Sequence, residues 1–244
     1  MKSTALHTMA RHYLRSRRGK QPRTYGVVAA MLAEVVRLDP DDLPAPRQLA
    51  AALATAAGVP CYESLRATGA EAEVIDEERR LFREAIRSWL HQDFAVEPLP
   101  YERLLGDEEA AVWNRRLHER WGHRVGLWMP TIDADAPAGM LRLATSAMQD
   151  DGPGAELLPE VLRGMGLSRV IEIREPGTTV SLIDVDLVEA FYTGVEAVWI
   201  DETLDWIIYT SHNWTVEISG TLADRLRAAW PDVDDWLWER PDWY

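Results

Sequence analysis

A serine and a histidine stand side by side at Ser211 and His212, between two apolar runs in the stretch DWIIYTSHNWTVEISG. In hydrolases a histidine base takes the proton of a serine hydroxyl, and a third group orients the imidazole ring. Neighbouring residues on a β-strand point to opposite faces, so these two side chains are not expected to meet. The runs instead predict a β-hairpin with a two-residue turn, His212-Asn213, whose asparagine accepts a positive φ. We therefore predict no catalytic residue, and we interpret His212 as an exposed contact to a partner.

Paired carboxylates occur at Asp133 and Asp135 and again at Asp184 and Asp186. Alternating carboxylates on a strand share one face, and their oxygens are ligands that Mg²⁺ and Ca²⁺ accept. In a chain this acidic such pairs arise readily by chance, so we interpret them as solvated strand ends or loops. A hydrolase or metal-dependent enzyme that uses Asp184, Asp186 or His212 stays as a third hypothesis for the function.

Metal and cofactor motifs are missing from the sequence. Its six histidines form no His-Glu-x-x-His pattern, and its single cysteine, Cys61, can form neither an internal disulfide nor a thiolate metal site. Neither a Walker A loop nor a G-x-G-x-x-G loop is present, so we expect no cofactor and no metal. The single cysteine suits a reducing compartment. Because neither a run of about 18 apolar residues nor a signal-peptide core occurs, we expect a cytoplasmic protein without a membrane partner.

Charge is distributed unevenly along the chain. The net charge is −14, yet the first 33 residues hold seven basic residues and no acidic one, which leaves 19 basic against 40 acidic residues in the remainder. An anionic body of that kind attracts basic partners and repels nucleic acid. We interpret the basic start as a cationic arm that folds onto its own acidic body or faces solvent, with phosphate binding as the alternative. The candidate contacts to nucleic acid are Arg11, Arg15, Arg17, Arg18, Lys20 and Arg23.

A short alanine-rich stretch supports the nucleic-acid alternative. Leu53-Ala54 and, after three further residues, Gly58-Val59 resemble the second helix and turn of helix-turn-helix DNA-binding domains. Pro60 departs from that pattern where a recognition helix would begin, and only Arg66 supplies a positive charge just beyond it. The resemblance implies a DNA-binding regulator that acts through residues 49–69, which we keep as the second hypothesis. An alanine-rich core helix explains the same residues.

Tryptophan is concentrated toward the C-terminus, since all eleven tryptophans lie at or after Trp89. The last stretch of the chain sets several of them among aspartates. In protein interfaces aromatic side chains anchor a partner, and carboxylates steer a basic one toward the surface. The pattern favours a binding surface for another protein, with the alternative that the tail folds over its own sheet. The predicted partner-binding residues are His212, Trp214, Asp234, Asp235, Trp236 and Trp238.

The chain has two parts with different sequence patterns. Its first part carries helical periodicity, and the rest mixes helices with short β-branched and aromatic runs. We therefore predict an α+β fold: a helical N-terminal region with the basic arm at 1–93, a connector at 94–106, and an α+β domain at 107–244 with a mainly antiparallel sheet and flanking helices. Ser3 or Thr4 is expected to cap the first helix and Thr221 the last. The predicted helices are 3–16, 25–38, 47–57, 69–92, 107–122, 155–166 and 221–230, and the predicted strands are 124–130, 169–175, 196–201, 205–211 and 214–219.

The segment 196–230 resembles the C-terminal end of uncharacterised bacterial proteins, some of which are similar to immunity proteins of toxin systems. Trp199, the Asp205-Trp206 pair, Ser211-His212, Gly220 and the hydrophobic alternation carry this resemblance, which covers about a seventh of the chain. It implies a small cytosolic protein that acts by binding, in the manner of an immunity protein or an inhibitor. The use of only two lysines against 24 arginines indicates a GC-rich bacterial genome.

Overall fold

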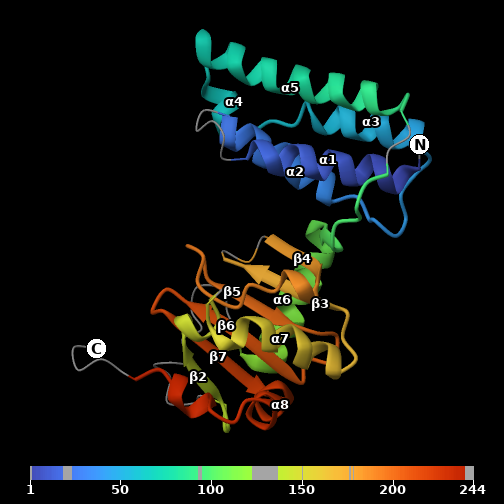
Figure 1. Ribbon diagram of the computed structural model, residues 1–244. Helices are drawn as coiled ribbons and strands as arrows, with labels where there is room; N and C mark the ends of the chain where they lie inside the picture. The colour runs from blue at the N-terminus through green and yellow to red at the C-terminus, as the bar shows by residue number, and fades with distance from the viewer. Residues whose placement is uncertain are drawn as a thin grey trace. The chain divides into compact units, whose positions relative to one another are not determined.

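The computed structural model describes residues 2–18, 24–92, 95–122, 137–149, 151–175, 177 and 179–239. The chain divides into two compact units, Met1–Leu99 and Pro100–Tyr244 (Figure 1). The first is helical, and the second combines helices with an antiparallel sheet, so the predicted α+β class is confirmed. Within the described residues, no helix combines the length and the apolar character needed to cross a membrane.

The N-terminal unit is a bundle of helices packed on their apolar faces. Its core consists of side chains with no exposed surface, such as Leu6, Met31, Leu53 and Phe82. Within a helix the buried residues recur at helical spacing, as Leu6, Ala10 and Leu14 do, which is why each helix buries one stripe against its neighbours. The helices are α1 (Ser3–Arg17), α2 (Tyr25–Val36), α3 (Pro46–Ala56), α4 (Tyr62–Arg66) and α5 (Ala70–Trp89).

Two of the predicted helix caps are wrong. The hydroxyl of Ser3 donates a 2.6 Å hydrogen bond to the carbonyl of Pro44 and so ties α1 to the loop before α3 instead of capping α1. Helix α8 (Thr221–Ala229) begins after Gly220, and Thr221 makes no capping bond. Gly220 has a φ of 74°, and a Cβ there would lie 2.0 Å from the carbonyl oxygen of Asp205, so the chain can turn from strand to helix only with glycine.

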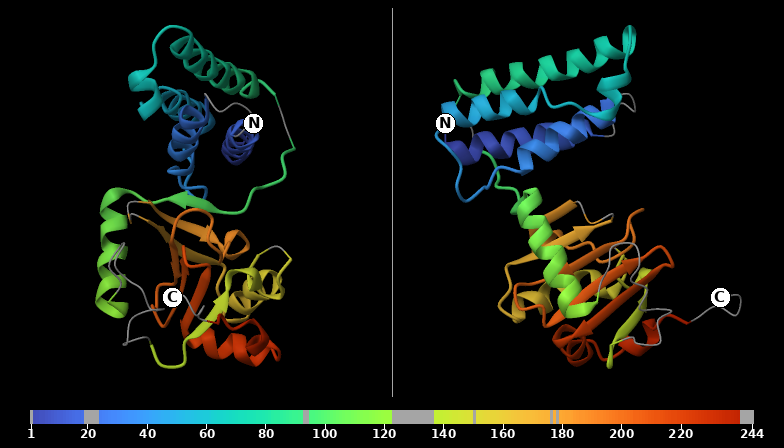
Figure 2. Two further views of the ribbon diagram at one scale, coloured as in Figure 1. Left: turned by 90° about the vertical axis from the view of Figure 1, so that its left-hand side faces the viewer. Right: turned by 180° about the vertical axis from the view of Figure 1, so that it is seen from behind.

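Among its described residues, the C-terminal unit is built on a seven-stranded antiparallel sheet with the order β1-β4-β3-β5-β6-β7-β2. Helix α6 (Asp107–Trp121) covers one face, and α7 (Pro153–Gly164) and α8 cover the other (Figure 2). The strands are β1 (Glu102–Leu104), β2 (Leu141–Ala144), β3 (Arg169–Arg174), β4 (Thr179–Asp184), β5 (Ala197–Ile200), β6 (Trp206–Ser211) and β7 (Thr215–Gly220).

Both faces of the central strands are buried, which explains their nearly continuous apolar sequences. Along β6, Trp206 and Ile208 face the layer of α7 and α8, whereas Ile207 and Tyr209 face α6. The indole rings of Trp199 and Trp206 are at most 1% exposed. These two tryptophans therefore belong to the core and cannot contact a partner.

Four predicted strands coincide with β3, β5, β6 and β7, and the predicted strand at 124–130 lies outside the described residues. The division after Leu99 falls within the predicted connector, but that connector also contains β1, which pairs with β4 and is part of the sheet. Strands β1, β2 and β4 do not appear among the predicted ones. Of these, β2 forms the edge of the sheet beside β7.

Candidate functional site

The hairpin between β6 and β7 ends in a three-residue loop. Ser211 is paired with Thr215, so His212, Asn213 and Trp214 form the loop, and the predicted two-residue turn is wrong. The backbone N–H of Trp214 donates a 3.0 Å hydrogen bond to the carbonyl of Ser211. The residue with positive φ is Trp214, at 62°, and not the asparagine. This is the common loop that combines a turn with a left-handed residue, but here a bulky side chain occupies the left-handed position.

The left-handed backbone turns the indole of Trp214 outward, where 60% of the residue is exposed. The aromatic ring of Tyr192 meets it edge-on, with 5.9 Å between ring centroids and an interplanar angle of 75°. The carbonyl oxygen of Trp214 accepts a 2.9 Å hydrogen bond from the backbone N–H of Thr145, just after β2. A left-handed conformation costs an L-residue about 1–2 kcal/mol. The exposed indole is therefore held in place by the fold at a cost in stability.

His212 is anchored by Glu196, which precedes β5. The Glu196 carboxylate contacts Nδ1 of the His212 ring and accepts a 3.3 Å hydrogen bond from its backbone N–H. The other carboxylate oxygen accepts a 2.5 Å bond from the hydroxyl of Tyr209. Burial acts to raise the pKa of Glu196, but the hydrogen bonds from Tyr209 and His212 outweigh it and hold this pKa below its usual value. Burial and the Glu196 carboxylate raise the pKa of the Tyr209 phenol.

Ser211 and His212 do not come together. Ser211 is 2% exposed, and its hydroxyl oxygen accepts a 3.1 Å hydrogen bond from the backbone N–H of Asn213. The His212 side chain is 55% exposed. The geometry can position a loop firmly, but it offers no hydroxyl to the imidazole.

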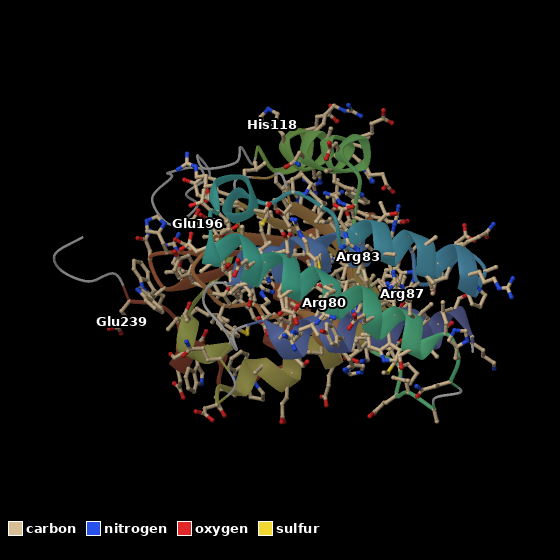
Figure 3. The ribbon with its side chains drawn as sticks, turned by 90° about the horizontal axis from the view of Figure 1, so that it is seen from above. Arg80, Arg83, Arg87, His118, Glu196 and Glu239 are labelled. Atoms are coloured by element: carbon tan, nitrogen blue, oxygen red, sulfur yellow. The ribbon has the colours of Figure 1, made fainter. Side chains whose placement is uncertain are left out.

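The C-terminal tail folds along the free edge of β2. Leu237 forms a β-bridge with Leu143, and the backbone N–H of Trp238 donates a 2.9 Å hydrogen bond to the carbonyl of Arg142. The Arg142 guanidinium lies 5.9 Å from the centre of the Trp238 ring. Glu239, the last residue described, lies at the outer end of this tail (Figure 3). The tail thus covers a sheet edge that would otherwise expose unpaired backbone groups.

Trp236 is half-buried. Its ring packs against the core, and its centroid lies 6.4 Å from that of Trp230. Asp234 and Asp235 precede it in the short 3-10 helix η4 (Val233–Trp236) and are both exposed. The tail therefore matches each alternative in part: it folds over its own sheet, and it also presents carboxylates and aromatic edges to solvent.

The hairpin loop and the tail lie at the same end of the sheet, on opposite sides of β2. Strand β2 runs antiparallel to β7, so Ala144 lies opposite Thr215, next to the loop. The tail runs antiparallel to β2, which places Trp236 toward that same end. A pocket of about 470 Å³ opens there, lined by Phe191, Trp236, Asp151, Ser146 and Gln149. We call the four aromatic residues at this end the indole surface; its members are Phe191, Tyr192, Trp214 and Trp236.

The negative charge of the protein resides in the unit that carries the indole surface. Residues 100–244 hold 12 basic and 27 acidic side chains, a balance of −15, whereas residues 1–99 hold 14 basic and 13 acidic ones, a balance of +1. Exposed carboxylates close in the chain to the indole surface or to the pocket include Asp151, Asp234 and Asp235. A cationic partner is therefore attracted to this unit and not to the helical one.

A buried carboxylate that the sequence analysis did not single out lies on the α6 side of β7. Glu217 is 1% exposed, and within the described part of the chain its carboxylate oxygens and the hydroxyl of Ser219 have no hydrogen-bond partner of good geometry. The guanidinium of Arg142 lies close to it, with 3.9 Å between Nε of Arg142 and Oε1 of Glu217. Burial raises the pKa of Glu217 to about 7, against the opposing effects of the neighbouring Thr215 hydroxyl and of the positive charge of Arg142. The alternation of β7 placed Glu217 on a strand face, but the sequence does not reveal that this face is covered.

Asp184 and Asp186, the acidic pair of the enzyme hypothesis, each bond to a different part of the protein. Asp184 accepts a 2.5 Å hydrogen bond from the backbone N–H of Tyr101, and Asp186 forms an ion pair with Arg163. Strands β3 and β5 lie between β4, which ends at Asp184, and β6, which precedes His212. Among the described residues no group of three or more metal-ligating side chains converges. Asp133 and Asp135 lie outside the described residues.

The basic residues of the predicted arm are mostly part of the bundle, because residues 3–17 form α1. Arg11 is 2% exposed within α1, and Arg17 pairs with the buried Glu78 of α5. The guanidinium of Arg18 lies over the ring of Tyr25, 5.3 Å from its centre. Arg15 also belongs to α1 and also has an interaction partner, while Lys20 and Arg23 lie outside the described residues.

The segment that resembles a helix-turn-helix contains only one turn of helix after α3. This helix, α4, has five residues, too few to lay a reading face along a major groove. Other arginines, Arg80, Arg83 and Arg87, follow one another along α5 (Figure 3). Of these, Arg80 pairs with Glu77 and Glu84.

In comparisons with known proteins, no protein-family model, no curated protein and no solved structure matches this chain.

Proposed function

We propose that this protein acts in the cytoplasm by binding a basic protein through the indole surface and its rim of carboxylates. The observation that carries the proposal is Trp214: a large aromatic side chain, 60% exposed, held by a backbone conformation that costs stability. Strain of this kind persists where the surrounding structure imposes it, and it concentrates at binding sites. Aromatic anchors of this type dominate the energy of protein interfaces.

The supports of Trp214 make the loop a preorganised element. Its backbone is fixed by bonds to Ser211 and Thr145, and Tyr192 backs its ring. Glu196 restrains the neighbouring His212 through both its ring and its backbone. A loop that is ordered before binding loses less conformational entropy when the partner arrives. The exposed indole is therefore an efficient anchor.

Charge supports a cationic partner. The unit that bears the indole surface has a balance of −15, and Asp151, Asp234 and Asp235 are exposed carboxylates close in the chain to that surface or to the pocket. A surface of that sign accelerates the association of a basic protein and slows that of nucleic acid. This argues for the protein-binding hypothesis over the DNA-binding one, whose Arg11 and Arg17 are buried or paired.

An immunity-like or inhibitor-like role is the concrete form of the proposal. The segment 196–230, which carries the resemblance to proteins similar to immunity proteins, forms β5, β6, β7 and α8. It therefore builds the centre of the sheet and contains His212 and Trp214. In this role the partner is a basic toxin or enzyme whose action is blocked by the bound protein.

The proposal is tested by affinity capture from the host organism with three baits: the natural chain, Trp214→Ala and Tyr62→Ala. Tyr62 is a matched control because it is an aromatic residue with similar exposure, 65%, in the other unit. We expect a basic protein to be retained by the natural chain and by the control, and its recovery to fall at least about tenfold with Trp214→Ala, the loss typical of an interface anchor. Equal recovery on all three baits contradicts the proposal.

A further inference from the structure

The pocket at the indole surface has the composition of a receptor for a cation. Two aromatic residues, Phe191 and Trp236, line it together with the acidic residue Asp151, and Ser146 and Gln149 complete the lining. Its volume of about 470 Å³ lies in the range that side-chain and small-ligand sites occupy. None of these five residues is basic, so the pocket supplies negative charge and aromatic rings without a positive group of its own.

The two aromatic rings of this pocket differ from many other aromatic rings of the chain, because no arginine of the described residues lies over them. Elsewhere the protein places its own arginines over its own rings: Arg66 lies 4.3 Å from the centre of the Tyr62 ring, and Arg116 lies 4.5 Å from that of Trp113. Seven such pairs occur among the described residues, and none of them involves Phe191 or Trp236. These two rings retain the capacity to receive a cation from outside.

Trp236 is also held ready for that role. Its indole packs against the core beside Trp230, so the ring does not need to be ordered when a ligand enters. Phe191 packs on the same core cluster. Asp151, by contrast, is exposed and can turn toward an incoming donor. The pocket therefore combines fixed aromatic walls with an adjustable carboxylate.

We propose that this pocket receives one arginine side chain of the basic partner, a proposal that rests on the function inferred above. A guanidinium is planar, so it stacks flat on aromatic rings and at the same time donates paired hydrogen bonds to a carboxylate. A lysine ammonium is not planar and cannot do both. Gln149 and Ser146 offer further acceptors for its remaining N–H groups. Trp214 then anchors the partner beside the pocket, and the arginine fixes its register.

The test uses the full chain and a short blocked peptide with one central arginine, compared with the same peptide carrying citrulline, the neutral isostere of arginine. The indole N–H signal of Trp236, assigned by its loss in Trp236→Phe, is followed by NMR during titration. We expect saturable shifts with the arginine peptide at about millimolar concentration, and at least about fivefold weaker binding of the citrulline peptide. Asp151→Asn should weaken the arginine peptide by a similar factor, and Glu160→Gln, an exposed carboxylate on α7, should not.

Three results overturn the inference: no shift of the Trp236 signal up to about 10 mM peptide, equal binding of both peptides, or unchanged binding in Asp151→Asn. These outcomes are separable from a failure of the proposed function. If a partner is captured in a manner that depends on Trp214 but not on Asp151, the pocket inference is wrong and the binding function stands. If the arginine peptide binds but capture does not depend on Trp214, the pocket does bind arginine and the proposed binding function is wrong.

Discussion

The backbone N–H of Thr145 donates a 2.9 Å hydrogen bond to the carbonyl oxygen of Trp214, and this bond ties the end of β2 to the loop between β6 and β7. On the other side of Trp214, its own N–H donates to Ser211. The residue is thus fixed at both its backbone groups. Because the tail runs along the opposite edge of β2, the same strand carries the loop on one side and Trp236 on the other.

Replacing Trp214 by glycine is expected to stabilise the protein while it removes the anchor. Glycine adopts a φ of 62° without the steric cost that a Cβ brings, so the free energy of unfolding should rise by about 0.5 kcal/mol after the greater chain entropy of glycine is subtracted. Urea denaturation measures the change. Asn213→Gly serves as the control, since Asn213 has no positive φ and its replacement should lower stability. A loss of stability in Trp214→Gly would show that the conformation carries no strain.

Glu217 makes the stability of the protein depend on pH. Its folded pKa of about 7 lies above the unfolded value of 4.5, so the folded state binds more protons between these values. The free energy of unfolding therefore falls as the pH rises from 4.5 to 7 and is level above that range, with a total change of about 3 kcal/mol at most. Glu217→Gln should flatten this slope and raise stability at neutral pH, whereas Glu160→Gln should leave it intact. An unchanged slope in Glu217→Gln would refute this assignment.

Glu196 contributes to the pH dependence of the free energy of unfolding with the opposite sign. Its folded pKa is lowered, so the stability it supplies is present above the unfolded value of 4.5 and is lost as the pH falls through the folded pKa. Tyr209→Phe removes the hydroxyl that donates to this carboxylate and should cost about 1–2 kcal/mol at pH 7. The cost should shrink once the carboxyl is protonated, which denaturation at low pH checks. Tyr25→Phe, at an exposed ring, is the control, and a cost in Tyr209→Phe that is independent of pH would count against the linkage.

Steering by Asp234 and Asp235 should appear in association rates. Changing both to asparagine removes two exposed charges beside Trp236, and we expect the association rate constant with the captured partner to fall about two- to fivefold while dissociation changes less. The effect should fade as salt rises, since both charges are exposed. Stopped-flow kinetics at two ionic strengths measure it. The pair Asp41 and Asp42, on the nearly neutral N-terminal unit, is the matched control, and an equal slowing in both double variants would exclude local steering.

Much of the fold follows from sequence patterns, and its gaps have physical causes. The β-branched runs of β3, β5, β6 and β7 predict strands because such side chains suit a pleated surface. The three residues of β1 and the Leu-Arg-Leu-Ala of β2 do not, because leucine, arginine and alanine favour helices in isolation and only pairing with β4 and β7 makes these segments strands. The edge that carries the tail was therefore missing from the sequence interpretation.

The sequence predicts Trp214 and Trp236 as candidate contacts, but it predicts neither Phe191, Tyr192 and Asp151 nor the geometry of the site. Turn chemistry assigned the positive φ to Asn213, because asparagine adopts it readily, whereas an aromatic residue gives no such signal. Nothing in the sequence places Thr145 against Trp214 or Trp236 at the same end of the sheet. In the same way, the basic start of the chain does not reveal that Arg17 pairs with Glu78, 61 residues further along, within the bundle.

The most direct measurement of the account is the affinity of the purified partner for the natural chain and for Trp214→Ala, determined by calorimetry with Tyr62→Ala beside them. The account predicts a dissociation constant at least about tenfold higher for Trp214→Ala, with the control unchanged and the unfolding transitions of all three intact. An affinity that does not change when Trp214 is removed would contradict it.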